Sequence, residues 1–138
     1  MKILILCTGN SCRSQMAQGF LQSFGKGNEV FSAGTFPASK VNPNAIKVMD
    51  EVGIDISRNI PGNVSQYLHE DWDYVITVCD DANEMCPIFP GKVKHRLHFG
   101  FQDPSNAIGS EEFIISEFRR IRDEIKNTFY TFYNDILI

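Results

Sequence analysis

The chain has 138 residues, of which 43% are hydrophobic and 22% are charged, a composition that favours a single globular domain over residues 1–138. Its formal net charge of −4 argues against nucleic acid as a partner, because phosphate backbones are bound by basic surfaces. No apolar run is long enough to span a bilayer, and the opening run is too short for the core of a signal peptide. We therefore expect no membrane association and a cytoplasmic location, where thiols stay reduced.

Strand and helix patterns alternate along the chain, without repeats or linkers. The predicted elements are, in chain order, a strand over 2–6, a helix over about 13–25, a strand over 30–33, a helix over 43–52, a strand over 74–78, a shorter strand over 95–99 and a long helix over about 110–136. This alternation is typical of the α/β class and predicts a three-layer sandwich with a four-stranded parallel sheet.

The long final helix is expected to pack against the sheet, because its apolar residues recur at spacings of three and four. This stripe consists of Ile114, Phe118, Ile121, Ile125, Phe129, Phe132 and Ile136. The chain is expected to be a monomer. The dense aromatic residues near its end, Phe129, Tyr130, Phe132 and Tyr133, leave a dimer surface as an alternative.

The stretch from Cys7 to Ser14 lies between the first predicted strand and the first predicted helix, and it has the features of an oxyanion-binding loop. Its residues are Cys7, Thr8, Gly9, Asn10, Ser11, Cys12, Arg13 and Ser14. Backbone N–H groups of such a loop converge on one point, and the helix dipole adds positive potential there. Arg13 can grip two oxygens of a tetrahedral anion through its planar guanidinium.

The same field is expected to stabilise a Cys7 thiolate, with Ser14 as a candidate hydrogen-bond donor to the sulfur. A cysteine followed by five residues, an arginine and a serine is the phosphate-binding loop of cysteine-dependent phosphatases. The alternative interpretation is a buried cysteine at the end of a strand, followed by a solvated Arg13. The position of the motif between a strand and a helix start favours the anion site.

Two further features indicate catalytic residues at the edge of the sheet formed by the carboxyl ends of the strands, where Cys7 lies. Cys79 follows a predicted inner strand, as Cys7 does, and ligands of parallel sheets bind beyond the carboxyl ends of strands. Asp103 precedes Pro104, which rigidifies the loop, so Asp103 is a candidate general acid for a departing oxygen. An Asp-Pro pair is also a common turn, and only the Cys7 loop makes the catalytic interpretation preferable.

Hydrolysis of a phosphate ester requires only one cysteine, so it gives no role to Cys79 and Cys86. Reduction of a pentavalent oxyanion needs two electrons, which two thiols supply when they form a disulfide, and a third thiol can then resolve that disulfide. The alternative is that Cys79 is a buried strand residue and Cys86 is incidental. Zinc binding is not expected, since the cysteine spacings lack a Cys-x2-Cys pair and no histidine stands at ligand spacing.

These residues resemble the thioredoxin-coupled arsenate reductases, which are built on the low-molecular-weight tyrosine phosphatase fold. The resemblance covers most of the chain and is carried by residues 7–17, 41–43, 53–57, 78–82, 86–88 and 99–104. The interval from Cys79 to Cys86 discriminates, because the simple phosphatases lack that pair.

The resemblance implies a mechanism in which Cys7 attacks arsenate held by the loop and Arg13, while Asp103 protonates the leaving oxygen. Cys79 then attacks the Cys7 sulfur, arsenite departs, and Cys86 moves the disulfide to Cys79–Cys86 for thioredoxin to reduce. It further implies that Asn10 holds the loop, that Cys12 has no transfer role, and that no cofactor is needed besides thioredoxin as external reductant.

Certain relatives bind a potassium ion beside the loop, but Gln18, Ile60 and Gly62 stand here where those relatives have Glu, Thr and Asp. Loss of two carboxylates weakens the attraction for a hard cation, so we expect no metal at this place. Two other functions stay open at this point. One is a tyrosine phosphatase without a functional Cys79–Cys86 pair, and the other is a non-catalytic thiol sensor that binds arsenite. The residues between Cys79 and Cys86 are expected to be helical in the reduced protein and looped out once those two cysteines are joined.

Overall fold

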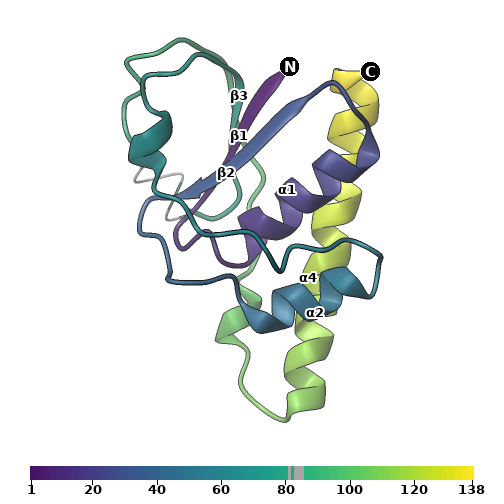
Figure 1. Cartoon of the computed structure of the whole chain (residues 1–138). Helices are drawn as coiled ribbons and strands as arrows, with labels where there is room; N and C mark the ends of the chain where they lie inside the picture. Colours follow the sequence, from purple (N-terminus) through teal and green to yellow (C-terminus); the bar gives the residue numbers. More distant parts are fainter. Residues whose placement is uncertain (81, 83–85) are drawn as a thin grey trace.

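The computed structural model describes residues 1–80, 82 and 86–138, and within them a four-stranded parallel sheet forms the centre of the molecule (Figure 1). The strands are β1 (Lys2–Cys7), β2 (Glu29–Gly34), β3 (Trp72–Thr77) and β4 (Val93–His98). The main helices are α1 (Arg13–Phe24), α2 (Pro43–Asp50) and α4 (Glu111–Phe132), and short 3-10 turns are η1 (Val64–Tyr67) and η2 (Pro104–Asn106). The predicted α/β class and parallel sheet are confirmed.

Strand β1 lies in the interior of the sheet, whose order is β2-β1-β3-β4. Its apolar run is buried on both faces, with Ile3, Leu4, Ile5 and Leu6 all 0% exposed. A strand covered on both sides needs such a continuous run, as the sequence predicted. By contrast, β4 is an edge strand with mostly exposed residues, including two basic side chains that discourage pairing with another chain.

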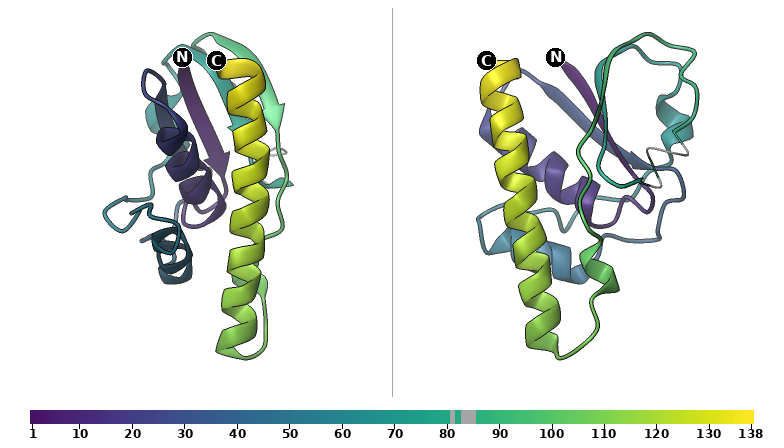
Figure 2. Two further views of the ribbon diagram at one scale, coloured as in Figure 1. Left: turned by 90° about the vertical axis from the view of Figure 1, so that its right-hand side faces the viewer. Right: turned by 180° about the vertical axis from the view of Figure 1, so that it is seen from behind.

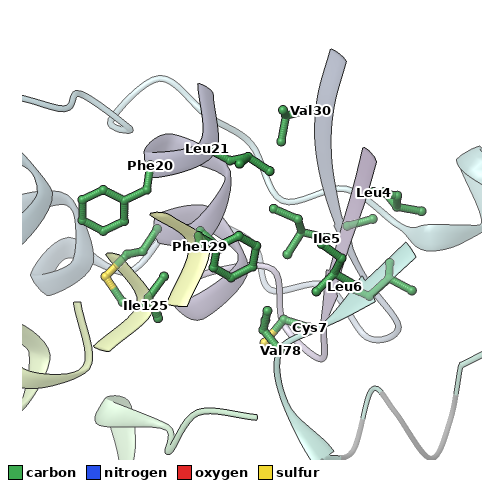
Figure 3. Packing of buried hydrophobic residues seen from close by; sticks show 14 of the residues in the cluster. Leu4, Ile5, Leu6, Cys7, Phe20, Leu21, Val30, Val78, Ile125 and Phe129 are labelled. Atoms are coloured by element: carbon green, nitrogen blue, oxygen red, sulfur yellow. The ribbon is translucent and has the colours of Figure 1, made fainter. Parts of the chain in front are cut away.

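Helices α1 and α4 lie side by side against one face of the sheet (Figures 1 and 2). Figure 3 shows Ile5 on this side of β1 with Leu21 and Phe129, whereas Leu4 points to the opposite side. The opposite face is covered by the η1 segment, whose Tyr67 ring contacts the rings of Phe31 and Trp72. The sheet is therefore the middle of three layers.

The third strand begins earlier than the predicted 74–78, because Trp72 is fixed by this aromatic group. Its indole Nε1 donates to the carbonyl of Tyr67 at 3.0 Å, and its ring is 1% exposed. The fourth strand likewise begins at Val93 and ends at His98, two residues and one residue before the predicted ends of 95–99. The first residues of β3 and β4 could not be predicted from the alternation of apolar and polar residues alone, since contacts with residues distant in sequence fix them.

Helix α4 carries the predicted apolar stripe, and its core members Phe118, Ile121, Ile125 and Phe129 are fully or almost fully buried. The helix closes in a π-helical turn over Tyr133–Leu137, and Ile136 is 44% exposed, so its assignment to the core was wrong. Within the described residues, α4 and every other helix is too short or too polar to cross a membrane.

The aromatic residues at the end of α4 are engaged inside the chain. Phe129 and Phe132 are buried against Phe99, whereas the rings of Tyr130 and Tyr133 both contact Phe24. This packing accounts for the aromatic density that suggested a dimer surface. The expected monomer stays a prediction.

Replacing Phe129 by alanine should lower the free energy of unfolding by about 3–5 kcal/mol, because a fully buried ring leaves a cavity between α4 and the sheet. Urea unfolding followed by circular dichroism measures this loss. The matched control is Phe113→Ala on the same helix, where the ring is 47% exposed and the expected change is within about 1 kcal/mol. Equal losses in the two variants would contradict the assignment of Phe129 to the core.

Candidate active site

The sheet order places a crevice at the carboxyl ends of β1 and β3. The connection from β1 to β2 runs through α1 on one face, and the connection from β2 to β3 passes the other face through η1. Ligands of parallel sheets bind where neighbouring strands are connected in opposite directions. Cys7 ends β1 and Cys79 lies two residues beyond β3, so both cysteines stand at this crevice as predicted.

The loop from Cys7 to Arg13 is built around Asn10, a fully buried residue with a φ of 50°. Its amide Nδ2 donates to Ser14 Oγ at 2.8 Å and to Ser32 Oγ at 2.9 Å. Its Oδ1 accepts from the backbone N–H of Gly62 at 3.0 Å and from Gln15 Nε2 at 3.3 Å. Asparagine tolerates the left-handed conformation, and these bonds fix it. The structure thus supports the holding role expected for Asn10.

Two glutamines of α1 extend this network, and sequence reasoning missed one of them. Gln15 is 1% exposed, donates to the carbonyl of Asn10 at 3.1 Å, and accepts from Asn59 Nδ2 at 3.0 Å. Gln18 accepts from the hydroxyl of Ser32 and donates to the carbonyl of Val30 at 3.3 Å. The sequence did contain a signal for Gln15, because it is a polar residue on the apolar face of the predicted helix. A buried amide must find hydrogen-bond partners, so such a residue indicates a buried polar network. The expected absence of a cation beside Gln18 stays a prediction.

A cavity of about 350 Å³ opens above the loop. The described residues that line it are Cys7, Thr8, Gly9, Ser11, Cys12, Arg13, Asp103, Ser105 and Asn106. Asn10 and Ser14 do not line it, because their side chains are buried beneath the loop, and their predicted contact with an anion stays a prediction. Ser14 accepts from Asn10, and no hydrogen bond from Ser14 to Cys7 is present among the described residues, contrary to expectation.

The loop below the cavity is rich in unused donors. The backbone N–H groups of residues 9–12 bind no acceptor in the described part of the chain, and α1 starts immediately afterwards at Arg13. Arg13 Nε is buried, and no described residue accepts its hydrogen. A buried donor without a partner costs about 1–3 kcal/mol, so these groups are suited to bind the oxygens of an anion.

Arg13 and Asp103 are brought together at the edge of the cavity. Arg13 Nη1 donates to the carbonyl of Phe101 at 3.1 Å, and its Nη2 lies 3.4 Å from Asp103 Oδ2. Asp103 Oδ1 accepts from the backbone N–H of Ser105 at 3.0 Å and from its hydroxyl at 2.6 Å, at the start of η2. One carboxylate oxygen therefore orients the side chain, and the other faces the guanidinium and the cavity.

The thiols of Cys7 and Cys79 are almost completely buried, and each shifts the pKa of the other. The pKa of Cys79 is lowered to about 5, mainly by the hydrogen bond from Cys7 and also by the Thr8 hydroxyl, whose oxygen lies 3.3 Å from the sulfur. The same hydrogen bond to Cys79, together with burial, raises the pKa of Cys7, although Arg13 acts in the opposite direction. The interaction with Cys79 thus opposes the thiolate expected on Cys7, and the sulfur that carries the charge in this pair stays a prediction.

Cys86 lies apart from the cavity and is only partly buried. Its sulfur is 3.8 Å from Arg96 Nη1, and it lines a separate pocket of about 200 Å³ with residues of β3 and β4. The structure therefore places Cys7 and Cys79 together and Cys86 elsewhere. The helix expected between Cys79 and Cys86 falls largely on residues 81 and 83–85, which lie outside the described residues.

Comparison with known proteins decides the family. The family model of the low molecular weight phosphotyrosine protein phosphatases matches residues 2–136. The chain belongs to this family. An arsenate reductase of Halalkalibacterium halodurans is 47% identical over 94% of this chain and 93% of its own length. An arsenate reductase of Bacillus subtilis is 48% identical over 91% of this chain and 89% of its own.

A solved structure described as an arsenate reductase in the phosphate binding state superimposes with a TM-score of 0.82 at 31% identity, and the match covers 98% of both chains. The fold predicted from the sequence is thus that of the low molecular weight phosphatase family. Within this family the Cys7 loop is the expected anion site, and the geometry above supports that assignment.

The close approach of β2 to the loop makes Gly34 a test of the site. A Cβ at Gly34 would collide with the carbonyl oxygen of Thr8, whereas a Cβ at Gly62 would meet only Gln66 Oε1 at 3.7 Å. Gly34→Ala should therefore displace the loop and weaken phosphate protection of Cys7 against alkylation by about tenfold or more, the equivalent of one lost charge-assisted hydrogen bond. Gly62→Ala is the control. Full protection in the Gly34 variant would contradict the described loop geometry.

The Thr8 hydroxyl offers a second test. A donor to a thiolate lowers the pKa of that thiol, so Thr8→Val should raise the pKa of Cys79 above about 5 while keeping the shape of the side chain. The ultraviolet absorbance of thiolates, titrated in the variant and in a Cys79→Ser reference, measures this shift. Thr35→Val, in the loop after β2, is the control. A titration midpoint that does not move would show that the hydroxyl does not stabilise the thiolate.

Proposed function

We propose that this protein is an arsenate reductase that converts arsenate to arsenite through a relay of three thiols. The observation that carries the proposal is the placement of Cys7 and Cys79 next to each other, at the ends of neighbouring strands beside the anion cavity. A hydrolase needs one thiol there, whereas a reductase needs a second thiol within reach of the first. The 47% and 48% identity to the two arsenate reductases supports the same function.

Arsenate is a tetrahedral anion and fits the chemistry of the cavity. The backbone N–H groups of residues 9–12 and the Nε of Arg13 would bind its oxygens, and no other acceptor among the described residues competes for them. Thr8, Gly9, Ser11 and Cys12 would form the wall around the anion. Because the protein carries a net charge of −4, this attraction is local and arises from the loop and Arg13.

In the first step, Cys7 attacks arsenic and a sulfur–arsenic bond forms. The proton of Cys7 can pass to Cys79 along the hydrogen bond that joins them, so no separate base is needed. Asp103 in its protonated form would donate a proton to the departing oxygen, which leaves as water. Its position beside Arg13 at the cavity edge suits this role.

In the second step, Cys79 attacks the Cys7 sulfur and gives the proton that it received in the first step to an oxygen of the departing arsenite. The sulfur–arsenic bond breaks with its electron pair left on arsenic, so As(V) becomes As(III) and arsenite departs. Two thiols have lost two electrons and form a Cys7–Cys79 disulfide. The Thr8 hydroxyl and Arg13, which both lower the pKa of Cys79, ease the loss of this proton from the attacking sulfur.

In the third step, Cys86 attacks Cys79, and Cys7 leaves as a thiolate. This exchange moves the disulfide to Cys79–Cys86 without further oxidation. We propose thioredoxin as the external dithiol that reduces it, with no bound cofactor, and a cytoplasmic location as part of arsenic detoxification. The family also suggests a weak phosphatase side activity, since Cys7, Arg13 and Asp103 could hydrolyse an aryl phosphate.

Single cysteine-to-serine variants test the relay. Wild type should consume thioredoxin in proportion to arsenate, and Cys7→Ser should release no arsenite. Cys86→Ser should stop after one turnover with a Cys7–Cys79 disulfide, identified by peptide mass analysis, because the resolving thiol is missing. Cys12→Ser is the comparison for loss of a thiol from the same loop: Cys12 lines the cavity but has no place in the relay, so this variant should still transfer the disulfide to Cys79–Cys86.

Two results would overturn the proposal. If Cys86→Ser continued to cycle with thioredoxin at the wild-type rate, Cys86 would not be the resolving thiol. If wild type hydrolysed an aryl phosphate efficiently and released no arsenite from arsenate, the protein would be a phosphatase.

A further inference from the structure

We infer that Arg96 is a further catalytic residue, which holds Cys86 and stabilises its thiolate for the attack on the Cys7–Cys79 disulfide. This inference rests on the proposed function, because it gives Arg96 a role only in the third step of the relay. Arg96 stands on edge strand β4, far along the chain from the loop that binds the anion.

The contact between Arg96 and Cys86 is direct. Arg96 Nη1 lies 3.8 Å from Cys86 Sγ, within the range of an N–H···S hydrogen bond. The guanidinium also lies over the ring of Phe89, 5.4 Å from its centroid, and Phe89 is 6% exposed. A cation over the face of an aromatic ring is attracted by the ring, so Phe89 helps to hold the guanidinium beside the Cys86 sulfur.

Cys86 needs such a partner because its surroundings otherwise favour the neutral thiol. Partial burial raises its pKa, and the S–H group can donate to the carbonyl of Pro87 at 3.8 Å. Arg96 acts in the opposite direction through its charge and its hydrogen bond. Only a thiolate attacks a disulfide, and partial burial disfavours the thiolate of Cys86. Arg96 counteracts this effect of burial and so favours the reactive form of the resolving thiol.

The pocket around Cys86 contains one other titratable group among the described residues that line it. This group is His98, which also projects from β4 and whose Nε2 is 2.9 Å from Asp80 Oδ1. Its Nδ1 is 2.8 Å from Thr77 Oγ1 at the end of β3. Both ring nitrogens of His98 are thus engaged by other groups, whereas Arg96 directs a donor to the sulfur.

The step is balanced in atoms and electrons. The Cys86 thiolate forms a bond to the Cys79 sulfur, the Cys7–Cys79 bond breaks, and Cys7 leaves as a thiolate within reach of Arg13 and the loop. The negative charge thus leaves the neighbourhood of Arg96 and arrives at the field of Arg13, which lowers the pKa of Cys7. The driving force of the step depends on both arginines, but only Arg96 acts on the attacking sulfur.

The test compares Arg96→Gln with Lys94→Gln. Lys94 is an exposed basic residue on the same strand, two positions away, and it pairs with Asp73 at 3.2 Å. Both substitutions remove one positive charge, so a general change of the field affects both. Arg96→Lys, which keeps the charge but not the planar group, serves as the rescue variant.

The first measurement is the rate of alkylation of Cys86 in the resting protein, resolved by peptide mass analysis over a range of pH. Arg96→Gln should move the midpoint upward by about 0.5–1 pH unit, the size expected for a half-exposed charge pair. The rate of alkylation at neutral pH should fall by only about two- to threefold. The fraction of Cys86 present as thiolate becomes smaller, but the more basic thiolate is also more nucleophilic and offsets part of this loss. Lys94→Gln should leave the midpoint unchanged, and Arg96→Lys should restore most of the shift.

The second measurement is a single turnover with arsenate and no thioredoxin. In Arg96→Gln the Cys7–Cys79 disulfide should persist about two- to threefold longer, while arsenite release stays at the wild-type rate. An unchanged midpoint, or an unchanged disulfide lifetime, would overturn the role of Arg96. A failure of the proposed function itself looks different, because wild type would then form no Cys7–Cys79 disulfide, or Cys86→Ser would cycle normally.

Discussion

The active loop depends on one buried side chain, that of Asn10. Its amide binds Ser14, Ser32, Gln15 and the backbone of Gly62, so one residue connects β1, α1, β2 and the segment before η1. This set of bonds keeps Asn10 at a φ of 50° and turns the neighbouring N–H groups away from any carbonyl of the described residues. The side chain of Asn10 thus holds the loop in the conformation that leaves the N–H groups of residues 9–12 without acceptors in the described chain.

A second consequence of this loop is the environment of the two buried thiols. Neither Cys7 nor Cys79 has enough water to stabilise a full charge, since both are 3% exposed. Each thiol shifts the pKa of the other, and the Thr8 hydroxyl and Arg13 favour the thiolate of Cys79. A small shift of the proton between two adjacent sulfurs converts one nucleophile into the other. The order of the first two steps therefore follows from where the anion binds.

The sequence was sufficient to predict the sheet, the loop and the shared rim of Cys7 and Cys79, because each depends on local pattern and on the direction of parallel strands. It could not predict the ends of β3 and β4, which depend on contacts such as that between Trp72 and Tyr67. It also gave the wrong partner for the hydroxyl of Ser14, which accepts from Asn10, because only the folded chain brings these two side chains together. Arg96 carried no signal at all, because an exposed arginine on an edge strand is ordinary.

The placement of the thiols gives the relay a direction. Cys7 and Cys79 are almost inaccessible, whereas Cys86 is only partly buried and lies outside the anion cavity. A disulfide that moves from the first pair to Cys79–Cys86 therefore carries the two oxidising equivalents from a closed site towards the surface. A protein reductant must reach a sulfur atom to attack it, and a bond between the buried sulfurs of Cys7 and Cys79 would offer no such access. In the proposed relay, separation of anion binding from re-reduction is the reason for a third thiol, and Arg96, remote from the anion loop, is the cation beside that thiol.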